Sequence, residues 1–207
     1  MIGRVALCIL LSVSAAHSQS IHPAVHIVRA GNSAGSGSCI WSGNNRSVIV
    51  TCSHVVSDAP SRVSADGVKG WLIANDRKND VALIEVQARF HVLPVYHGTL
   101  KRGDMVESIA FPGMRKAHRR GPVIGFFGKN VEANFVCLPG QSGGSVTFNG
   151  QVAGVSWGGK NGYRIAVITP SPFIRRLFEP FLRREMRYAQ PLVVEAGPND
   201  MVLVQSW

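Results

Sequence analysis

Residues 47–56 read Ser-Val-Ile-Val-Thr-Cys-Ser-His-Val-Val. The run opens with β-branched residues, which favour a pleated strand, and then passes into a small polar turn that carries His54. A side chain just beyond a strand end is placed to reach into a cleft. The stretch therefore predicts a strand followed by a candidate general base. Taken alone, a histidine at such a position is more often structural or simply exposed.

Short segments of the same kind recur from about residue 25 to residue 168. They are rich in Val and Ile and are separated by Gly, Asn, Asp and Pro. They cover residues 25–29, 37–41, 47–51, 68–74, 81–86, 105–111, 123–127, 145–148, 152–157 and 164–169. This pattern predicts an all-β sandwich or barrel. No long stretch there has helical periodicity, which argues against alternating strand and helix units.

One segment near the end predicts a helix. Apolar residues recur at three- and four-residue spacing from Phe173 to Met186, with arginines between them. The stripe is wide enough to dock onto a β domain. Pro180 interrupts the pattern, so we expect a kink or two short helices. The tail at 189–207 carries two short apolar runs, which fit either an extra hairpin or an extended chain.

The amino terminus has the layout of a secretory signal peptide. Arg4 supplies one positive charge, an apolar run follows, and small residues lie near Ala16. The alternative is a buried first strand or helix. No apolar run reaches the roughly 18–20 residues that a membrane span requires. We expect residues 1–18 to be a signal peptide and the protein to be secreted or periplasmic, and not a transmembrane protein. The 45% hydrophobic and 16% charged content is that of a folded chain.

Removal of that segment would leave Cys39, Cys52 and Cys137. An odd number of cysteines in an exported chain permits at most one bridge within it. Cys39 and Cys52 lie on consecutive strand-like segments and could pair. The plain alternative is that all three are small buried side chains.

The net charge is +10, and two stretches concentrate it: residues 115–120 and the arginines of 175–187. Such patches can attract nucleic acid, anionic lipid or acidic polymers. They can equally be a solvated loop and a solvated helix face. The chain has no zinc-finger spacing, RNA-binding aromatic motif or phosphate-binding Gly loop. Charge therefore predicts at most contact with an anionic surface, and no specific nucleic-acid binding is expected.

Residues 139–145 read Pro-Gly-Gln-Ser-Gly-Gly-Ser. A nucleophilic serine needs a tight, Gly-rich turn, because its hydroxyl must project freely and neighbouring N–H groups must turn toward a developing oxyanion. Gly140 and Ser142 are placed to donate those N–H groups. The plain alternative is an ordinary Gly-rich β-turn.

A serine hydroxyl is a weak nucleophile at neutral pH and needs a base, which in turn needs a carboxylate to orient it. His54 is the candidate base. Asp80 lies in Asn-Asp-Val-Ala-Leu-Ile at 79–84, directly before an apolar strand, and is the candidate carboxylate. By itself it would be read as a turn residue. The order His54, Asp80, Ser142 makes the three more specific together than singly.

These motifs resemble those of trypsin-like serine peptidases, and most closely the bacterial Deg/HtrA-type protease domains. The resemblance covers about residues 25–170. It rests on Thr-x-x-His-Val-Val at 51–56, Asp-Val-Ala-Leu at 80–83, Pro-Gly-Gln-Ser-Gly-Gly at 139–144, Ser-Gly-Ser-Cys-Ile at 36–40 and Ser-Trp-Gly at 156–158. The last is similar to the substrate-aligning segment of chymotrypsin-type enzymes.

The resemblance implies two six-stranded antiparallel β-barrels with the triad between them. The first barrel would span 25–96, with His54 and Asp80, and the second 97–170, with Ser142. A carboxy-terminal helix would cover 171–188. We expect a peptidase domain without the PDZ domain that many Deg-type enzymes append.

The implied activity is that of a serine endopeptidase without a metal or organic cofactor, acting on a polypeptide. His54, Asp80 and Ser142 would be catalytic, and the N–H groups of Gly140 and Ser142 would form the oxyanion hole. The substrate pocket would be lined by Val136, Cys137 and Leu138 and, opposite them, by Ser156, Trp157 and Gly158. None of these is acidic, so a basic substrate side chain would lack a compensating carboxylate. Cleavage after small or medium apolar residues is expected.

The family resemblance leaves one other function open. The chain could be a catalytically lapsed binding module of the same fold, using its basic patches. The intact triad argues against that alternative. A further departure is Gln141, which stands where digestive trypsin-like enzymes carry the aspartate that pairs with a newly cleaved amino terminus.

Overall fold

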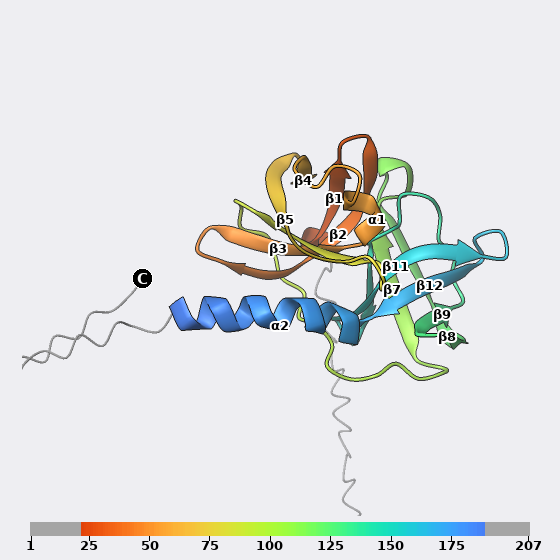
Figure 1. Cartoon of the computed structure of the whole chain (residues 1–207). Helices are drawn as coiled ribbons and strands as arrows, with labels where there is room; N and C mark the ends of the chain where they lie inside the picture. Colours follow the sequence, from red (N-terminus) through yellow and green to blue (C-terminus); the bar gives the residue numbers. More distant parts are fainter. Residues whose placement is uncertain (1–21, 189–207) are drawn as a thin grey trace, which may run out of the picture.

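The computed structural model describes residues 22–188; the predicted signal peptide at 1–18 and the tail at 189–207 lie outside this range. It consists of two closed barrels, each of six antiparallel strands, and a helix that follows them (Figure 1). The predicted fold class is confirmed.

The first barrel contains β1 to β6, arranged in the order β1-β2-β3-β6-β5-β4. Their bounds are β1 Val25–Ala30, β2 Ser33–Gly43, β3 Arg46–Thr51, β4 Val63–Ala65, β5 Val68–Asp76 and β6 Val81–Val86. All of β6 is buried, because one face of the strand lines the barrel interior and α2 covers the other face. This double burial explains why the strand reads as a nearly continuous apolar run.

The second barrel repeats this order in β7 to β12. Their bounds are β7 Met105–Ala110, β8 Ala117–Phe127, β9 Asn130–Ala133, β10 Ser145–Phe148, β11 Gln151–Lys160 and β12 Ile165–Pro170. Three short helical turns complete the β domain: η1 His22–Ala24, α1 Ser53–Val56 and η2 Pro112–Met114. Each predicted strand segment overlaps an observed strand, whereas β4 and β9 were not predicted.

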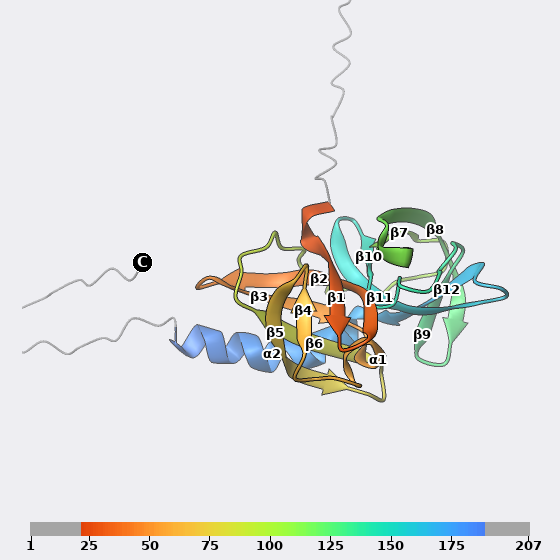
Figure 2. The same cartoon turned by 90° about the horizontal axis from the view of Figure 1, so that it is seen from above.

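The final helix, α2 (Ser171–Tyr188), follows the second barrel in sequence but packs along the first (Figures 1 and 2). Ile174, Phe178 and Phe181 are buried in the core of the first barrel. The Phe181 ring meets Trp41 edge to face, with 5.1 Å between centroids. The helix therefore ties the two barrels together, and the predicted docking of its apolar stripe is observed.

Pro180 lies inside one continuous helix. Of the two arrangements that the sequence allowed, the structure therefore does not have two short helices. Proline removes the N–H that would pair with the carbonyl of Arg176. Both residues face solvent, so water can satisfy that carbonyl while the buried face keeps its packing. Among the described residues, no helix has the length and apolarity needed to cross a membrane.

Candidate active site

The register of two strands brings His54 and Asp80 together. The chain leaves β3 at Thr51 and enters α1, whose first turn carries His54; Asp80 directly precedes β6. In the antiparallel β3–β6 pair, Thr51 lies opposite Ala82. The residues just after Thr51 therefore lie beside the residues just before Ala82. His54 and Asp80 meet because of this pairing.

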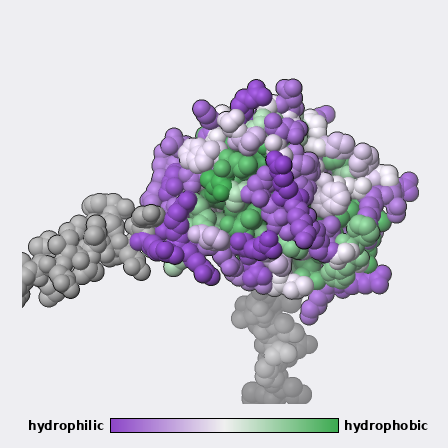
Figure 3. Space-filling view, viewed as in Figure 1, coloured by the Kyte–Doolittle hydropathy of each residue, from purple (hydrophilic) through white to green (hydrophobic). Residues whose placement is uncertain are grey.

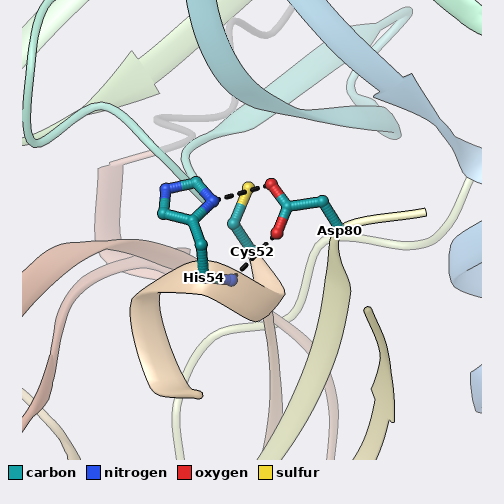
Figure 4. A group of neighbouring side chains, drawn as sticks. All are labelled: Cys52, His54 and Asp80. Carbon is teal, nitrogen blue, oxygen red and sulfur yellow. Dashed lines mark hydrogen bonds and ion pairs between the residues drawn. The ribbon is translucent and has the colours of Figure 1, made fainter. Parts of the chain in front are cut away.

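Asp80 holds His54 through two hydrogen bonds (Figure 4). Its Oδ2 lies 2.7 Å from the ring Nδ1 of His54, and its Oδ1 accepts the His54 backbone N–H at 2.9 Å. Burial by itself would raise the pKa of Asp80, but the hydrogen bonds and the charge interaction with His54 outweigh it and lower the pKa below its ordinary value. Asp80 is thus a carboxylate at neutral pH, as a group that accepts Nδ1–H must be.

The second barrel holds the residue before Asp80. Lys129, in the loop between β8 and β9, donates its Nζ to Asn79 Oδ1 and to the carbonyl of Lys78. Thr169 on β12 donates its hydroxyl to the Asn79 carbonyl at 3.1 Å. Asn79 is buried and Asp80 has a left-handed φ of 54°, so the carboxylate projects from a short, fixed segment. Sequence reasoning missed Lys129 and Thr169.

The loop that carries Ser142 begins with a type II turn. The Gln141 N–H donates to the Leu138 carbonyl at 3.0 Å, with Pro139 and Gly140 at the two central positions. A type II turn needs a positive φ at its third residue, and Gly140 has a φ of +90°. The sequence Leu-Pro-Gly-Gln is therefore suited to this conformation.

Two N–H groups of this loop are left without an internal partner. Those of Gln141, Gly143 and Gly144 donate to backbone carbonyls. Those of Gly140 and Ser142 have no hydrogen-bond acceptor within residues 22–188. They are the two groups that the sequence nominated for an oxyanion hole. Backbone donors that are held in place but unused can stabilise charge that develops on a substrate oxygen.

Residues of the first barrel hold the loop that carries Ser142 through hydrogen bonds. Ser36 on β2 donates its N–H to the Ser142 carbonyl at 2.8 Å and its hydroxyl to the Gly140 carbonyl at 2.9 Å. Thr51 fixes Ser36 in turn by donating to its carbonyl at 2.7 Å. A Cβ on Gly143 would lie 2.1 Å from the Ser36 oxygen, so only glycine allows this approach.

The Ser142 hydroxyl donates to the carbonyl of Trp157, at 3.4 Å. The hydrogen bonds of residues 22–188 include none between Ser142 and His54. The two segments nevertheless adjoin, because a Cβ on Gly143 would lie 2.9 Å from the backbone nitrogen of Cys52, two residues before His54. The structure thus brings the serine loop against the histidine segment, with the hydroxyl turned toward Trp157.

The predicted pocket residues fall into two groups. Val136, Leu138 and Trp157 are 39%, 38% and 37% exposed, so a substrate can reach them. Cys137 and Ser156 are buried. The Ser156 hydroxyl donates to the carbonyl of Gln141 at 3.0 Å and so supports the serine loop from behind.

Gly158 lies beyond a bulge in β11. The register with β12 shifts between Ser156 and Gly158, which pushes Trp157 out of the regular pairing. Bulges commonly redirect a residue at the rim of a site. Here the bulge presents the Trp157 carbonyl to Ser142.

Cys39, Cys52 and Cys137 are free and buried in the described structure. Of the two arrangements left open by the sequence, the structure shows buried thiols and not a Cys39–Cys52 bridge. Burial raises the pKa of Cys39 and of Cys137 to about 11. These two groups are therefore neutral thiols.

The two basic stretches differ in how far neighbouring carboxylates compensate their charge. In residues 115–120, His118 and Arg120 lie 3.3 and 3.6 Å from carboxylate oxygens of Glu107. On α2, Arg176, Arg183, Arg184 and Arg187 are exposed, and Arg176 lies 3.7 Å from a carboxylate oxygen of Asp76 on β5. The face seen in Figure 3 is mainly hydrophilic where this helix lies. The first stretch is thus partly neutralised, and the second is a solvated helix face.

Comparison with known proteins identifies the family. The profile of the trypsin-like peptidase domain matches residues 35–155. The inactive form of the Rv3671c protease of Mycobacterium tuberculosis is similar in structure, with a TM-score of 0.65, 20% identity, and coverage of 77% of this chain and 89% of that one. A serine endoprotease from Yersinia pestis has a TM-score of 0.65 and 22% identity over 79% of this chain and 64% of that one. None of the curated proteins compared with the chain matches it. Because the matched segment exceeds half of the sequence, the chain belongs to the trypsin-like peptidase family, and its enzyme class is serine endopeptidase.

Proposed function

We propose that this chain is an exported serine endopeptidase in which Ser142 is the nucleophile, His54 the general base and Asp80 the residue that orients it. The observation that carries the proposal is the pair of hydrogen bonds, 2.7 and 2.9 Å long, by which Asp80 fixes His54. The unused N–H groups of Gly140 and Ser142 support it. Export rests on the sequence pattern of residues 1–18.

The reaction follows from these positions. Ser142 Oγ turns from the Trp157 carbonyl to His54 Nε2 when a substrate binds, since catalytic hydrogen bonds often tighten only in the complex. It attacks the peptide carbonyl as His54 takes its proton, and Asp80 stabilises the imidazolium. His54 then protonates the departing amine. Water, activated by the same histidine, hydrolyses the acyl-enzyme.

The Trp157 carbonyl has a second use in this scheme. Once Ser142 has left it, it can accept the N–H of the substrate residue on the acyl side of the scissile bond. Val136 and Leu138 present apolar surface to that residue's side chain. We infer that this side chain is small or medium and apolar, because no carboxylate of the proposed pocket could compensate a buried positive charge.

Labelling with a serine-directed fluorophosphonate tests the nucleophile. Wild-type protein should be labelled, Ser142→Ala should not, and Ser61→Ala, which changes an exposed serine outside the proposed site, should label normally. A label retained in Ser142→Ala would refute the assignment. A wild-type protein that neither labels nor cleaves any peptide would favour the lapsed binding module.

Kinetics test the roles. His54→Ala and Ser142→Ala should each lower kcat on the order of 10⁶-fold, with the double variant little worse, because the residues act as a unit. Asp80→Asn should lower kcat on the order of 10⁴-fold by favouring the wrong histidine tautomer. Additive losses in the double variant would contradict a shared mechanism.

A further inference from the structure

A third reactive side chain lies beside His54 and Asp80. The Sγ of Cys52, a ring nitrogen of His54 and a carboxylate oxygen of Asp80 all lie within 4.8 Å of one another. In Figure 4 the thiol and the imidazole both approach the Asp80 carboxylate. The Cys52 thiol donates to the carbonyl of Ser156 at 3.3 Å, and the proposed reaction makes no use of it.

The three groups form a donor set suited to a thiophilic divalent cation. Zinc is bound in proteins by cysteine sulfur, histidine nitrogen and carboxylate oxygen, usually in tetrahedral geometry. One thiolate and one carboxylate would balance the charge of such a cation. That balance matters because Cys52 is fully buried, where an uncompensated charge is costly.

Coordination requires the ligand atoms to change their spacing and the Cys52 thiol to give up its hydrogen bond to the Ser156 carbonyl. With metal–ligand bonds of about 2.0–2.3 Å, tetrahedral ligand atoms lie roughly 3.3–3.8 Å apart. The Nδ1 and Oδ2 atoms are now 2.7 Å apart because they share a proton, so a cation that replaces this proton would separate them. The His54 side chain is 49% exposed, so a dissolved cation can reach the imidazole, whereas the Cys52 sulfur is buried.

We propose that Cys52, His54 and Asp80 form an inhibitory site for a thiophilic divalent cation such as zinc. On binding, Cys52 releases its proton to solvent, and the His54 proton is exchanged from Nδ1 to Nε2. The sulfur, Nδ1 and carboxylate each donate an electron pair, water fills the fourth position, and no group is oxidised or reduced. The consequence rests on the proposed function: His54 Nε2 then carries a proton and cannot accept that of Ser142.

Cys39 provides a matched control. It is also a buried thiol of the first barrel, and its Sγ donates to the Trp41 carbonyl at 3.2 Å. It belongs to no group of converging ligands among the described residues. Cys39→Ser should therefore perturb the barrel core in a similar way without touching the proposed site.

Binding is tested first, without reference to activity. Full-length Ser142→Ala protein is titrated with Co²⁺, and the thiolate-to-cobalt charge-transfer absorption is recorded. We expect the band to saturate near one equivalent, to persist when Cys39→Ser is added, and to vanish when Cys52→Ser or Cys52→Ala is added. Thermal unfolding of each variant verifies that it is folded. Absence of the band in Ser142→Ala, or its persistence without Cys52, would overturn the proposal.

Inhibition is tested second, with Zn²⁺ and a peptide substrate. Each protein is compared with itself in the presence of a chelator. Wild type and Cys39→Ser should lose half of their activity at zinc concentrations at least about 10–100-fold lower than Cys52→Ser, because losing a ligand should weaken binding at least as much as losing a residue that supports one. Equal zinc sensitivity of all three would count against the site. If the cobalt band depends on Cys52 but no peptidase activity is found, the cation site stands and the proposed function fails.

Discussion

The side-chain Oε1 of Gln141 accepts the backbone N–H of Leu138 at 2.6 Å, and the whole of Gln141 is buried beneath the serine loop. The loop is thus shaped by its own residues and by Ser36. A buried ammonium group is tolerated only beside a charged partner. The other polar atom of the Gln141 side chain, the amide Nε2, is itself a donor and cannot accept a hydrogen bond from an ammonium group.

We therefore expect that activity does not require a newly cleaved amino terminus. Protein that begins near His22 should have the same kcat/KM with an amino-terminal tag as after the tag is removed. The comparison uses one preparation, assayed before and after trimming. Activity that appears only after trimming to one particular residue would instead indicate a zymogen.

Gly143→Ala should inactivate the enzyme. The new methyl group would lie 2.1 Å from the Ser36 carbonyl oxygen and 2.3 Å from the Thr51 hydroxyl, and φ at this position is +83°. The left-handed conformation alone costs roughly 1–2 kcal/mol, and overpacking typically adds about 1–3 kcal/mol. Denaturant unfolding and kcat/KM measure the two effects.

Gly150→Ala separates strain from steric conflict. Gly150 has a φ of +74° but nothing within 4 Å of its missing Cβ. This variant should lose only about 1–2 kcal/mol and keep its activity. If Gly143→Ala and Gly150→Ala were equally active, the close packing of the loop that carries Ser142 against the first barrel would not matter for catalysis.

The sequence predicted strands well where the pattern was local. It missed β4 and β9, which have only three and four residues and too few apolar positions to display a period of two. They are strands because their neighbours close a barrel around them. The Asp66-Gly67 pair, with φ of 47° and 84°, was a usable hairpin signal, since such a pair favours a tight turn and implies a strand on each side.

The same distinction holds for the site. His54, Asp80 and Ser142 each lie in a short motif, so they could be nominated from local sequence. Their supports could not. Ser36 meets Gly140 across 104 residues, and Lys129 meets Asn79 across 50. Such contacts depend on how two barrels pack, and no local pattern encodes that packing.

Peptide-library cleavage tests the pocket. Val136, Leu138 and Trp157 offer accessible apolar surface, so cleavage should follow Val, Ala or Leu. Leu138→Ala should change kcat/KM most for the larger of these side chains, by roughly 10-fold, about the effect of one or two lost methylene contacts. A dominant preference for Arg or Lys would show that the pocket lies elsewhere.

His26 should make stability fall in mild acid. It is buried on β1, stacks on Phe90 with ring centroids 4.0 Å apart, and lies 2.8 Å from a carboxylate oxygen of Asp66. Burial lowers its pKa from the ordinary 6.5, and His91 adds to this; the hydrogen bond and charge of Asp66 oppose the shift without cancelling it. At pH values between the pKa of His26 in the folded protein and its pKa in the unfolded chain, the unfolded chain binds more protons than the folded protein. The stabilising contribution is therefore complete above pH 6.5 and is lost as the pH falls below it.

The measurement is the Tm of wild type and His26→Gln from about pH 7.5 down to about pH 5. Asp76 and Asp80 do not interfere in this pH window. Their pKa values in the folded protein are lowered from the ordinary 3.8, so the stability that they contribute is lost only below pH 3.8. The glutamine can still donate to Asp66 but does not titrate, so its Tm should fall less steeply with acid than that of wild type. Parallel curves for the two proteins would show that His26 does not carry the acid sensitivity. Such a result would mean that the folded barrel accepts a proton on His26 as readily as the unfolded chain does. The buried Nε2 of His26 argues against this, because it has no hydrogen-bond partner among the described residues.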